Sequence, residues 1–470
     1  MTLSAPIIWV VFPLVMAGVC GVLNKRPVLS LIIASATAFG LALLAGFFPE
    51  DLLLPLGPLE FPVEESLRLL GRRITLAESI LPFIAFIYGV TGLWLLSSNL
   101  PGVPNTFRPI SLVITSALTA ALGVEPFLYA ALLIQTAVLV SVPMLIAPGK
   151  ESHRGVLRYL SLMTIAMPFV LIAGWLLTGV VILPPESPLI GQSAIVLGLG
   201  FALWLAVFPF HSWVPMVSQH SHPTVTSFLL FILPTTILVF GLNFLNRYAF
   251  LRTSDVIFNL IRMIGVVMIV FGGVWAAVQD HLKRVFGFSV LVETGFSLLA
   301  IGLLTAGGLN SLLLLFPVRA LGYWLWGYTL SRLEDHCGSL EISAIQGYGR
   351  KLPLLAAGLV LAQLSVAGLP LLASFPIKIT LLTQVLKEGT ALGVWSFIGS
   401  LGLFLFTIRL MLNFLLPIGT TTASLWSLEE RTSEFLPVLL LVVVLVILGL
   451  FPANFTAGIT SILTGFTQLQ

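Results

Sequence analysis

Four charged side chains lie where the sequence is otherwise apolar, and these residues could carry or exchange a charge. The bases Lys378, Arg319 and Arg409 and the acid Glu293 fall inside long hydrophobic segments. A charge near the centre of a bilayer is costly, so such residues are rare and are functional candidates by default. Lysine and glutamate can exchange a proton, whereas arginine hardly ever loses its own. These residue types therefore indicate proton or ion transfer.

Lys378 ends a stretch that contains Gly368, Pro370 and Pro376, which interrupt a helical pattern. A broken helix inside a membrane frees backbone groups that need water or protein partners. A hydrated lysine at such a break could load and release protons. The alternative is a lysine whose ammonium group reaches toward the membrane interface.

Arg319 and Glu293 extend this pattern in the same part of the chain. Arg319 could set the local field or pair with an acid, but its lasting charge makes it a poor proton carrier. Glu293 is the available acid, and the sequence leaves their pairing open. We interpret Arg409 as an interfacial or subunit-contact residue.

Three histidines, His211, His220 and His222, lie within twelve residues and could bind a metal or relay protons. A tight metal site would need a further Cys, Asp or Glu, and none lies between Ser187 and Leu251. We therefore expect no metal. His211 stays a candidate for a polar relay, with simple loop packing as the alternative.

The two cysteines, Cys20 and Cys337, are far apart in sequence. Iron–sulfur clusters and structural zinc need several clustered ligands, so we expect no cofactor of either kind. The sequence also contains no phosphate-binding glycine loop and no nucleic-acid signature. We expect two inert thiols.

The composition predicts an all-α integral membrane protein. Of the 470 residues, 58% are hydrophobic and only 9% are charged, which no soluble domain of this length shows. A membrane-spanning helix needs about 20 apolar residues, and about 14 such segments can be placed. The predicted spans are 6–23, 27–48, 78–98, 108–123, 126–147, 158–182, 190–210, 223–246, 257–278, 285–305, 309–331, 353–384, 390–416 and 435–465.

The segments between these spans predict an orientation. Loops counted as odd from the N-terminus carry more Lys and Arg, which places them inside and both termini outside. Met1 to Pro6 lacks the basic residues of a cleavable signal. The longest polar loop, Pro49 to Arg73, is predicted to be a solvated outer loop, with contact to a partner subunit as the alternative.

Pro209 interrupts one hydrophobic segment, and Pro370 interrupts another about 160 residues later. Paired broken helices in corresponding halves are typical of transporters built from inverted repeats.

Four motifs, in order and with suitable spacing, resemble a known family. They are Pro209-Phe210-His211-Ser212-Trp213-Val214-Pro215, the stretch Pro223 to Ser227, the turn Gln279 to Ser289 with Lys283, and the broken helix Ala367 to Lys378. Residues from about 105 to 380 resemble the antiporter-like membrane subunits of respiratory complex I, multisubunit Na+/H+ (Mrp-type) antiporters and membrane hydrogenases.

The resemblance implies inverted five-helix repeats with broken helices. It divides the chain into N-terminal helices and an outer loop (1–105), a first half (106–250), a second half (251–416) and a C-terminal helix (417–470). It implies that ions move along titratable groups. The candidate site residues are Lys378, Arg319, Glu293, His211 and Lys283.

The chain departs from the family pattern mainly in the first half. The glutamate of the fifth helix falls at Gln135, with Glu125 as the rival position, and the lysine five residues before Pro209 falls at Trp204. Losing one charged partner would strand the other in low dielectric, whereas losing both is tolerable. We interpret the first half as a half-channel retired as a unit. Other family positions fall at Pro234 (a lysine), Leu315 (a histidine) and Arg319 (a lysine), and Lys378 alone keeps its type.

We therefore predict an antiporter-like subunit of a complex I-type assembly, in a plasma, thylakoid or other energy-transducing membrane. It would take part in redox-coupled translocation of protons or Na+ with a degenerate first half, beside other membrane-arm subunits and lipid. It would hold no redox centre of its own, and we expect no nucleic-acid partner. The alternatives are a non-pumping scaffold subunit and an Mrp-type antiporter subunit or stand-alone transporter.

Overall fold

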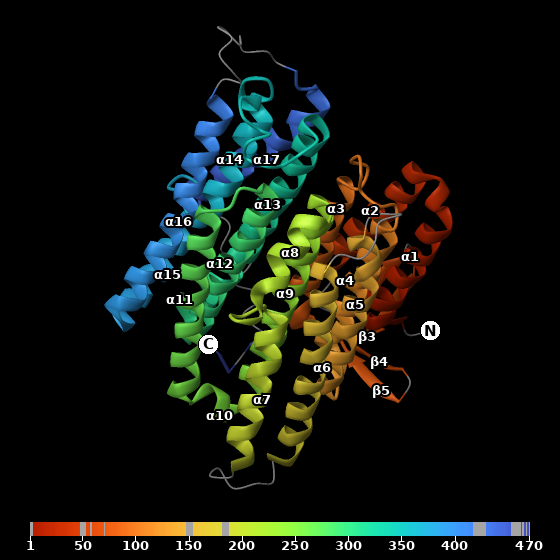
Figure 1. The fold of residues 1–470 in the computed structure, drawn as a ribbon. Helices are drawn as coiled ribbons and strands as arrows, with labels where there is room; N and C mark the ends of the chain where they lie inside the picture. Colours follow the sequence, from red (N-terminus) through yellow and green to blue (C-terminus); the bar gives the residue numbers. More distant parts are fainter. Residues whose placement is uncertain are drawn as a thin grey trace.

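The structure is a computed structural model, and the chain folds into a bundle of helices (Figure 1). It describes residues 3–47, 53–56, 59–69, 71–146, 154–180, 188–416, 429–452, 462, 465–466 and 468–469. The helices are α1 (Phe12–Val22), α2 (Pro27–Gly46), α3 (Leu81–Leu96), α4 (Phe107–Gly123), α5 (Ala130–Leu145), α6 (Arg154–Val180), α7 (Pro188–Trp204), α8 (Trp213–His220), α9 (Pro223–Arg247), α10 (Ala249–Arg252), α11 (Asp255–Ala277), α12 (Leu282–Gly302), α13 (Ala306–Cys337), α14 (Pro353–Ala367), α15 (Ser374–Glu388), α16 (Thr390–Leu415) and α17 (Thr432–Leu450).

Short 3-10 or π segments precede or follow several of these helices. They are η1 (Ile7–Val11), η2 (Leu23–Lys25), η3 (Glu78–Ile80), η4 (Phe127–Tyr129), η5 (Phe210–Ser212) and η6 (Tyr348–Arg350).

The predicted membrane helices are confirmed. Within the described residues, 11 helices are long and apolar enough to cross a membrane, and the shorter apolar helices Phe107–Gly123, Leu189–Trp204 and Pro353–Ala367 fall on three further predicted spans. In lipid every backbone group must be satisfied internally, which is why these apolar segments are helical. The chain is an integral membrane protein.

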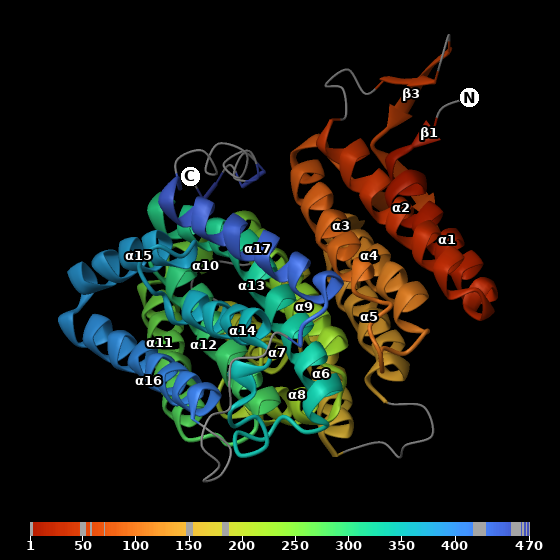
Figure 2. The ribbon, with the colours of Figure 1, turned by 90° about the horizontal axis from the view of Figure 1, so that it is seen from above.

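Two helices form the centre of the bundle. The buried share of the apolar, membrane-spanning stretch differs from helix to helix. This stretch is entirely buried in α12 and 89% buried in α9, whereas in α17 only 22% of it is buried. A helix that is apolar around its whole circumference is buried or faces lipid, and α12 and α9 are of the buried kind. Both views show α1 at one edge of the molecule and α15 and α16 at the opposite edge (Figures 1 and 2). Any group on α12 is therefore shielded from lipid by neighbouring helices.

Two helices are broken, as predicted. Between α7 and α8, Ala206 adopts a left-handed backbone with φ 53°. Between α14 and α15, Gly368 (φ 84°) and Leu371 (φ 77°) do the same. Non-glycine residues adopt positive φ only at a cost in energy, which the surrounding packing must offset. Each predicted half thus contains one interrupted helix in the same place in its element order, α4 to α9 and α11 to α16.

The long polar loop between α2 and α3 differs from the prediction of a plain solvated loop. Its described residues form short strands, which pair with one another and also with the N-terminus and the α4–α5 connection. Strand β3 (Leu59–Glu64) lies between β1 (Leu3–Ser4) and β2 (Leu53–Leu56). Strand β5 (Arg72–Thr75) lies between β4 (Ser66–Leu69) and β6 (Val124–Glu125). Residues 48–52, 57–58 and 70 of this loop lie outside the described part.

Candidate functional site

The candidate site is an ion network at the centre of the second half. Glu293 projects from the middle of α12. Its Oε1 atom accepts a hydrogen bond from Lys378 Nζ of α15 at 2.5 Å. Its Oε2 atom accepts one from Arg319 Nε of α13 at 3.2 Å. The Arg319–Glu293 pairing that the sequence left open is therefore made, Lys378 joins it, and one carboxylate connects three separate helices.

Further polar groups satisfy the two cations. Arg319 Nη2 donates to the Glu293 backbone oxygen at 2.8 Å and to Ser297 Oγ at 2.6 Å. Lys378 Nζ donates to the backbone oxygen of Val366, the last turn of α14 before the break. Lys378 Nζ also lies 4.4 Å from the ring centroid of Phe296. The broken helix thus supplies a carbonyl that an intact helix would keep for itself.

Burial makes these charges strongly dependent on one another. The exposed fractions of Glu293, Arg319 and Lys378 are 3%, 5% and 3%. With all three ionised, two cations share one anion and the network holds one net positive charge. Removing one partner from a buried ion pair leaves an uncompensated charge and is strongly destabilising. A proton that leaves or joins Lys378 therefore changes the energy of the whole network.

Lys283, another predicted site residue, belongs to a second centre at the start of α12. Its Nζ atom pairs with Glu334 Oε1 at 2.6 Å. His222, the residue before α9, contacts Ser331 Oγ with Nε2 at 3.3 Å. Burial and the nearby Lys283 charge lower the pKa of His222 to about 4, against the opposing effects of a hydrogen bond to Pro101 and of Glu334. Lys283 is thus separate from the Glu293 network.

The structure does not bring His211 into either centre. Its ring stacks on Phe208 at 5.4 Å between centroids and meets the edge of Phe271 at 4.5 Å. Its buried Nδ1 atom has no hydrogen-bond partner among the described residues. The ring contacts of His211 are aromatic, and its part in a polar relay stays a prediction. The family motif marks this residue by position, and position in a motif does not by itself imply contact with the charges.

Arg409 also lies outside the network. Near the end of α16, it donates to the backbone oxygen of Gln279 at 3.0 Å and pairs with Asp280. Its side chain is 39% exposed, which suits the interfacial position that we predicted.

The corresponding part of the first half contains no charge at the aligned positions. Gln135 lies within α5 and donates from Nε2 to Thr164 Oγ1 at 2.8 Å. The rival position Glu125 is exposed in strand β6, where the backbone register places it opposite Arg73 of β5. Trp204 is fully buried, with Phe201 and Phe240 at ring-centroid distances of 5.8 and 6.2 Å. Aromatic rings fill this core, and Pro234 is buried and non-ionisable as well. In the second half, Leu315 is likewise buried and cannot ionise.

Sequence reasoning missed two groups of residues. Glu334 lies just beyond the predicted span 309–331, so its link to Lys283 was not considered. Gln363 is fully buried on α14 and contacts Ser289 and Trp326. A lone glutamine in an apolar span was the only available signal.

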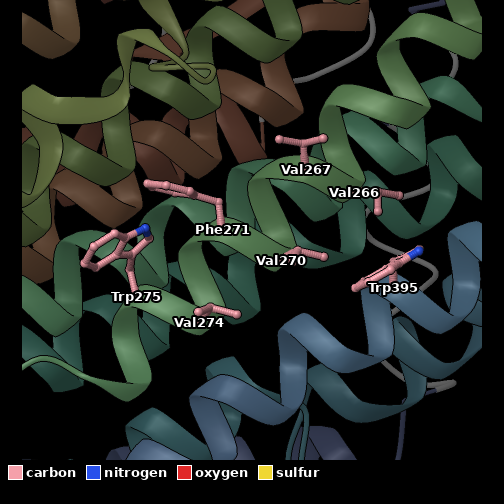
Figure 3. A pocket seen from close by; sticks show the side chains of 7 residues that line it. All are labelled: Val266, Val267, Val270, Phe271, Val274, Trp275 and Trp395. Carbon is pink, nitrogen blue, oxygen red and sulfur yellow. The ribbon is translucent and has the colours of Figure 1, made fainter.

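A groove of about 460 Å³ lies between α11 and α16 (Figure 3). All of its lining side chains are apolar or aromatic, so it provides no site for an ion. They are Val266, Val267, Val270, Phe271, Val274, Trp275 and Trp395.

The central part of the chain is similar to a known family. Residues 182–405 match the transmembrane family described as NADH:quinone oxidoreductase/Mrp antiporter. The matched region contains Trp204, Glu293, Arg319 and Lys378, so the whole ion network falls inside the part of the chain that is similar to this family.

Curated relatives are similar in sequence to part of this chain. NADH-quinone oxidoreductase subunit N of Bdellovibrio bacteriovorus is 27% identical over 213 residues, which cover 43% of each protein. Subunit N of Heliobacterium modesticaldum is 26% identical over 331 residues, which cover 66% of each. The matched part spans about half of the length of these relatives.

Solved structures share the antiporter-like fold over nearly the whole chain. A chain of the archaeal membrane-bound sulfane sulfur reductase superposes with a TM-score of 0.83 at 16% identity, covering 99% of this chain and 98% of that one. A chain of the Mrp complex from Dietzia sp. gives 0.81 at 15% identity, covering 99% of both. A chain of respiratory complex I from Thermus thermophilus gives 0.75 at 20% identity, covering 98% and 99%.

Proposed function

We propose that this chain is an antiporter-like subunit of a complex I-type assembly. In this proposal it takes part in redox-coupled proton translocation through its second half, while its first half is inactive. The observation that carries the proposal is the buried Glu293 carboxylate, shared by Lys378 and Arg319 beside a broken helix. An apolar bundle gains nothing in stability from such a network that well-packed apolar residues could not supply. The presence of this network therefore favours a role in moving charge over a purely structural role.

Lys378 is the member of the network suited to change charge. Arg319 keeps its proton, so it acts as a fixed positive charge that holds Glu293 as a carboxylate. When Lys378 carries its proton, the network has one net positive charge, and when the proton leaves, Glu293 and Arg319 remain as a neutral pair. Lys378 follows the break between α14 and α15, where the backbone can adjust its position relative to Glu293. Redox steps in other subunits would act on Lys378 through neighbouring charges.

The chemistry of the network favours a proton over Na+. Hard metal cations bind where several oxygen ligands converge. Among the described residues of the network, Glu293 is the single carboxylate, and both of its oxygens already accept hydrogen bonds from cations. A bound Na+ ion would also be repelled by the positive charges of Lys378 and Arg319. A proton needs no such cage, because Lys378 itself takes it up.

Partner subunits follow from the same proposal. The three structural relatives above are chains of multisubunit membrane complexes, named for sulfane sulfur reduction, for Mrp and for respiratory complex I. Neighbouring membrane-arm subunits would then supply the electron chemistry. The competing function, a non-pumping scaffold, is favoured by the aromatic core around Trp204.

Translocation by the native complex tests the proposal. The complex is purified and reconstituted with wild type, Lys378→Ala or Lys351→Ala, and assembly is checked on a native gel. Lys351→Ala is the control, because its pair with Glu429 is 3.9 Å long and about half exposed. We expect Lys378→Ala to assemble and to lower the number of protons moved per electron, with Lys351→Ala unchanged. Unchanged translocation in an assembled Lys378→Ala complex would establish the scaffold function instead.

A further inference from the structure

Helix α12 runs through the second half from one side of the membrane to the other. Lys283 and Gly302 are 19 residues apart, and at about 1.5 Å per residue they are separated by about 29 Å. This is close to the thickness of the hydrocarbon core, about 30 Å. Glu293 lies midway between them, so the ion network sits near the middle of the membrane.

On the Lys283 side, a layer of uncharged groups separates the network from the Lys283–Glu334 pair. Gln363 Oε1 accepts from Trp326 Nε1 at 3.0 Å, and Gln363 Nε2 donates to Ser289 Oγ at 3.3 Å. Ser289 lies one helical turn from Glu293, and the ring of Phe286 packs 5.3 Å from that of Trp326. Gln363 is fully buried and lies one turn before the carbonyl that accepts from Lys378. The amide is therefore a polar connection beside the aromatic pair Phe286–Trp326.

Beyond this layer, the Lys283–Glu334 ion pair is partly exposed to solvent. The Glu334 side chain is 35% exposed, whereas that of Lys283 is 9% exposed. Because α12 and α13 run antiparallel, the pairs Lys283–Glu334 and Glu293–Arg319 lie at two levels of the same helical hairpin. One end of the hairpin thus carries charge at the surface, and its middle carries charge in the interior.

On the opposite side of Glu293, two buried amide oxygens have no partner. Asn310 Oδ1 on α13 and Gln384 Oε1 on α15 are inaccessible to solvent and accept no hydrogen bond from the described part of the chain. Gln384 packs against the start of α13, since a Cβ at Gly307 would lie 2.5 Å from its Nε2 atom. Buried polar atoms are nearly always satisfied, so such oxygens indicate bound water.

A second ion pair, partly exposed to solvent, lies at the Gly302 end of α12. Arg262 Nη1 contacts Glu388 Oε2 at 2.5 Å, and the Glu388 side chain is 44% exposed. Arg262 lies against the end of α12, because a Cβ at Gly302 would be 2.6 Å from its Cγ atom. Glu388 and Gln384 lie one turn apart on α15, which also carries Lys378.

We infer that the second half alone forms a complete proton path between the two membrane faces. The path follows a polar file, Lys283, Gln363, Glu293, Lys378, Gln384 and Glu388, in which water bridges the intervals. This inference rests on the proposed function of Lys378 and adds both ends of its path. Gln363 and Gln384 are positioning residues, because they hold water and hydrogen bonds next to Lys378 and keep their own protons. No step crosses the aromatic core of the first half.

Translocation by reconstituted complexes tests the two glutamines. We expect Gln363→Leu and Gln384→Leu each to lower translocation at least fivefold, and Gln363→Asn to recover part of the loss. Gln135→Leu is the matched control, a buried glutamine of the first half, and should leave translocation unchanged. If Lys378→Ala stops translocation while both Leu variants leave it unchanged, the path is wrong and the proposed function stands. If Lys378→Ala has no effect, the proposed function itself fails.

Sided thiol labelling gives a measurement that does not depend on activity. Cys20 and Cys337 are first replaced by serine, and Ser289→Cys, Gln384→Cys or Ser141→Cys is added. A small, charged, membrane-impermeant methanethiosulfonate reagent is applied to either side of sealed vesicles. We expect Ser289→Cys to react from the Lys283 side only, Gln384→Cys from the Glu388 side only, and the first-half control Ser141→Cys from neither. Reaction of the first two from the same side, or from neither side, would overturn the path.

Discussion

The two antiporter-like halves place opposite kinds of side chain in their cores. In the second half, Glu293 joins two cations with almost no exposure to solvent. In the first half, Trp204 is equally buried but is surrounded by Phe201 and Phe240. Both cores are tightly filled, one by ion pairs and the other by aromatic packing. The same architecture thus tolerates either solution.

The difference follows the rule that a buried charge needs its partner. A buried acid without its base, or the reverse, carries the full cost of desolvation. The first half has neither, since Gln135 makes a neutral hydrogen bond to Thr164. The second half keeps an acid with two bases. Each of these buried charges thus has a partner of opposite sign.

Glu293→Gln should break the comparison most strongly. It leaves Lys378 and Arg319 as two buried cations with no anion, which should lower the free energy of unfolding by about 3–5 kcal/mol. Thermal unfolding of the detergent-solubilised complex, followed on this subunit, measures the loss. The control Glu388→Gln removes an exposed acid whose pair with Arg262 should contribute about 0–1 kcal/mol. Equal shifts for the two variants would mean that the Glu293 network is not a buried ion network.

A triple variant sharpens the same point. Glu293→Leu with Arg319→Met and Lys378→Met converts the second half to the apolar state of the first. We expect it to recover most of the stability lost in Glu293→Gln, because no unpaired charge remains, while translocation stays absent. A triple variant as unstable as the single one would show that the network is needed for folding as well as for transport.

Trp204→Lys introduces a charge into the apolar core of the first half, whereas the variants above remove charges from the second half. It places a cation among aromatic rings with no acid at the aligned position, and a lysine in mid-membrane costs about 3 kcal/mol. We expect a lower unfolding temperature and no gain in translocation. Trp204→Phe is the control, since it keeps an apolar ring. A stable Trp204→Lys variant that moves more protons would mean that the first half still contains a usable path.

The sequence predicted the membrane helices well, because hydropathy reports directly on burial in lipid. It also marked Glu293, Arg319 and Lys378 as unusual, because each is a charge in an apolar segment. It could not show that they meet, since Glu293 and Lys378 are 85 residues apart and Glu293 and Arg319 are 26 apart. Those contacts depend on how three helices pack. The strands of the polar loop also escaped prediction, although β2 pairs with β3 and β4 with β5 inside the loop. Only the pairs with β1 and β6 depend on distant parts of the chain.

His222 offers the smallest test, at the place where the two halves meet. It precedes α9 of the first half and contacts Ser331 on α13 of the second. Its pKa is about 4, below the usual 6.5, because burial disfavours the charged imidazole.

Between about pH 6.5 and pH 4, the unfolded chain therefore binds a proton at this histidine that the folded chain does not. The contribution of His222 to folding stability is complete above about pH 6.5 and is lost as the pH falls toward 4. Between pH 7 and pH 5 we expect a loss of about 1–2 kcal/mol from this residue. His222→Gln should remove that part of the pH dependence in unfolding experiments, whereas the control His220→Gln should keep it. An unaltered pH profile in His222→Gln would mean that the two halves do not depend on a neutral imidazole at their junction.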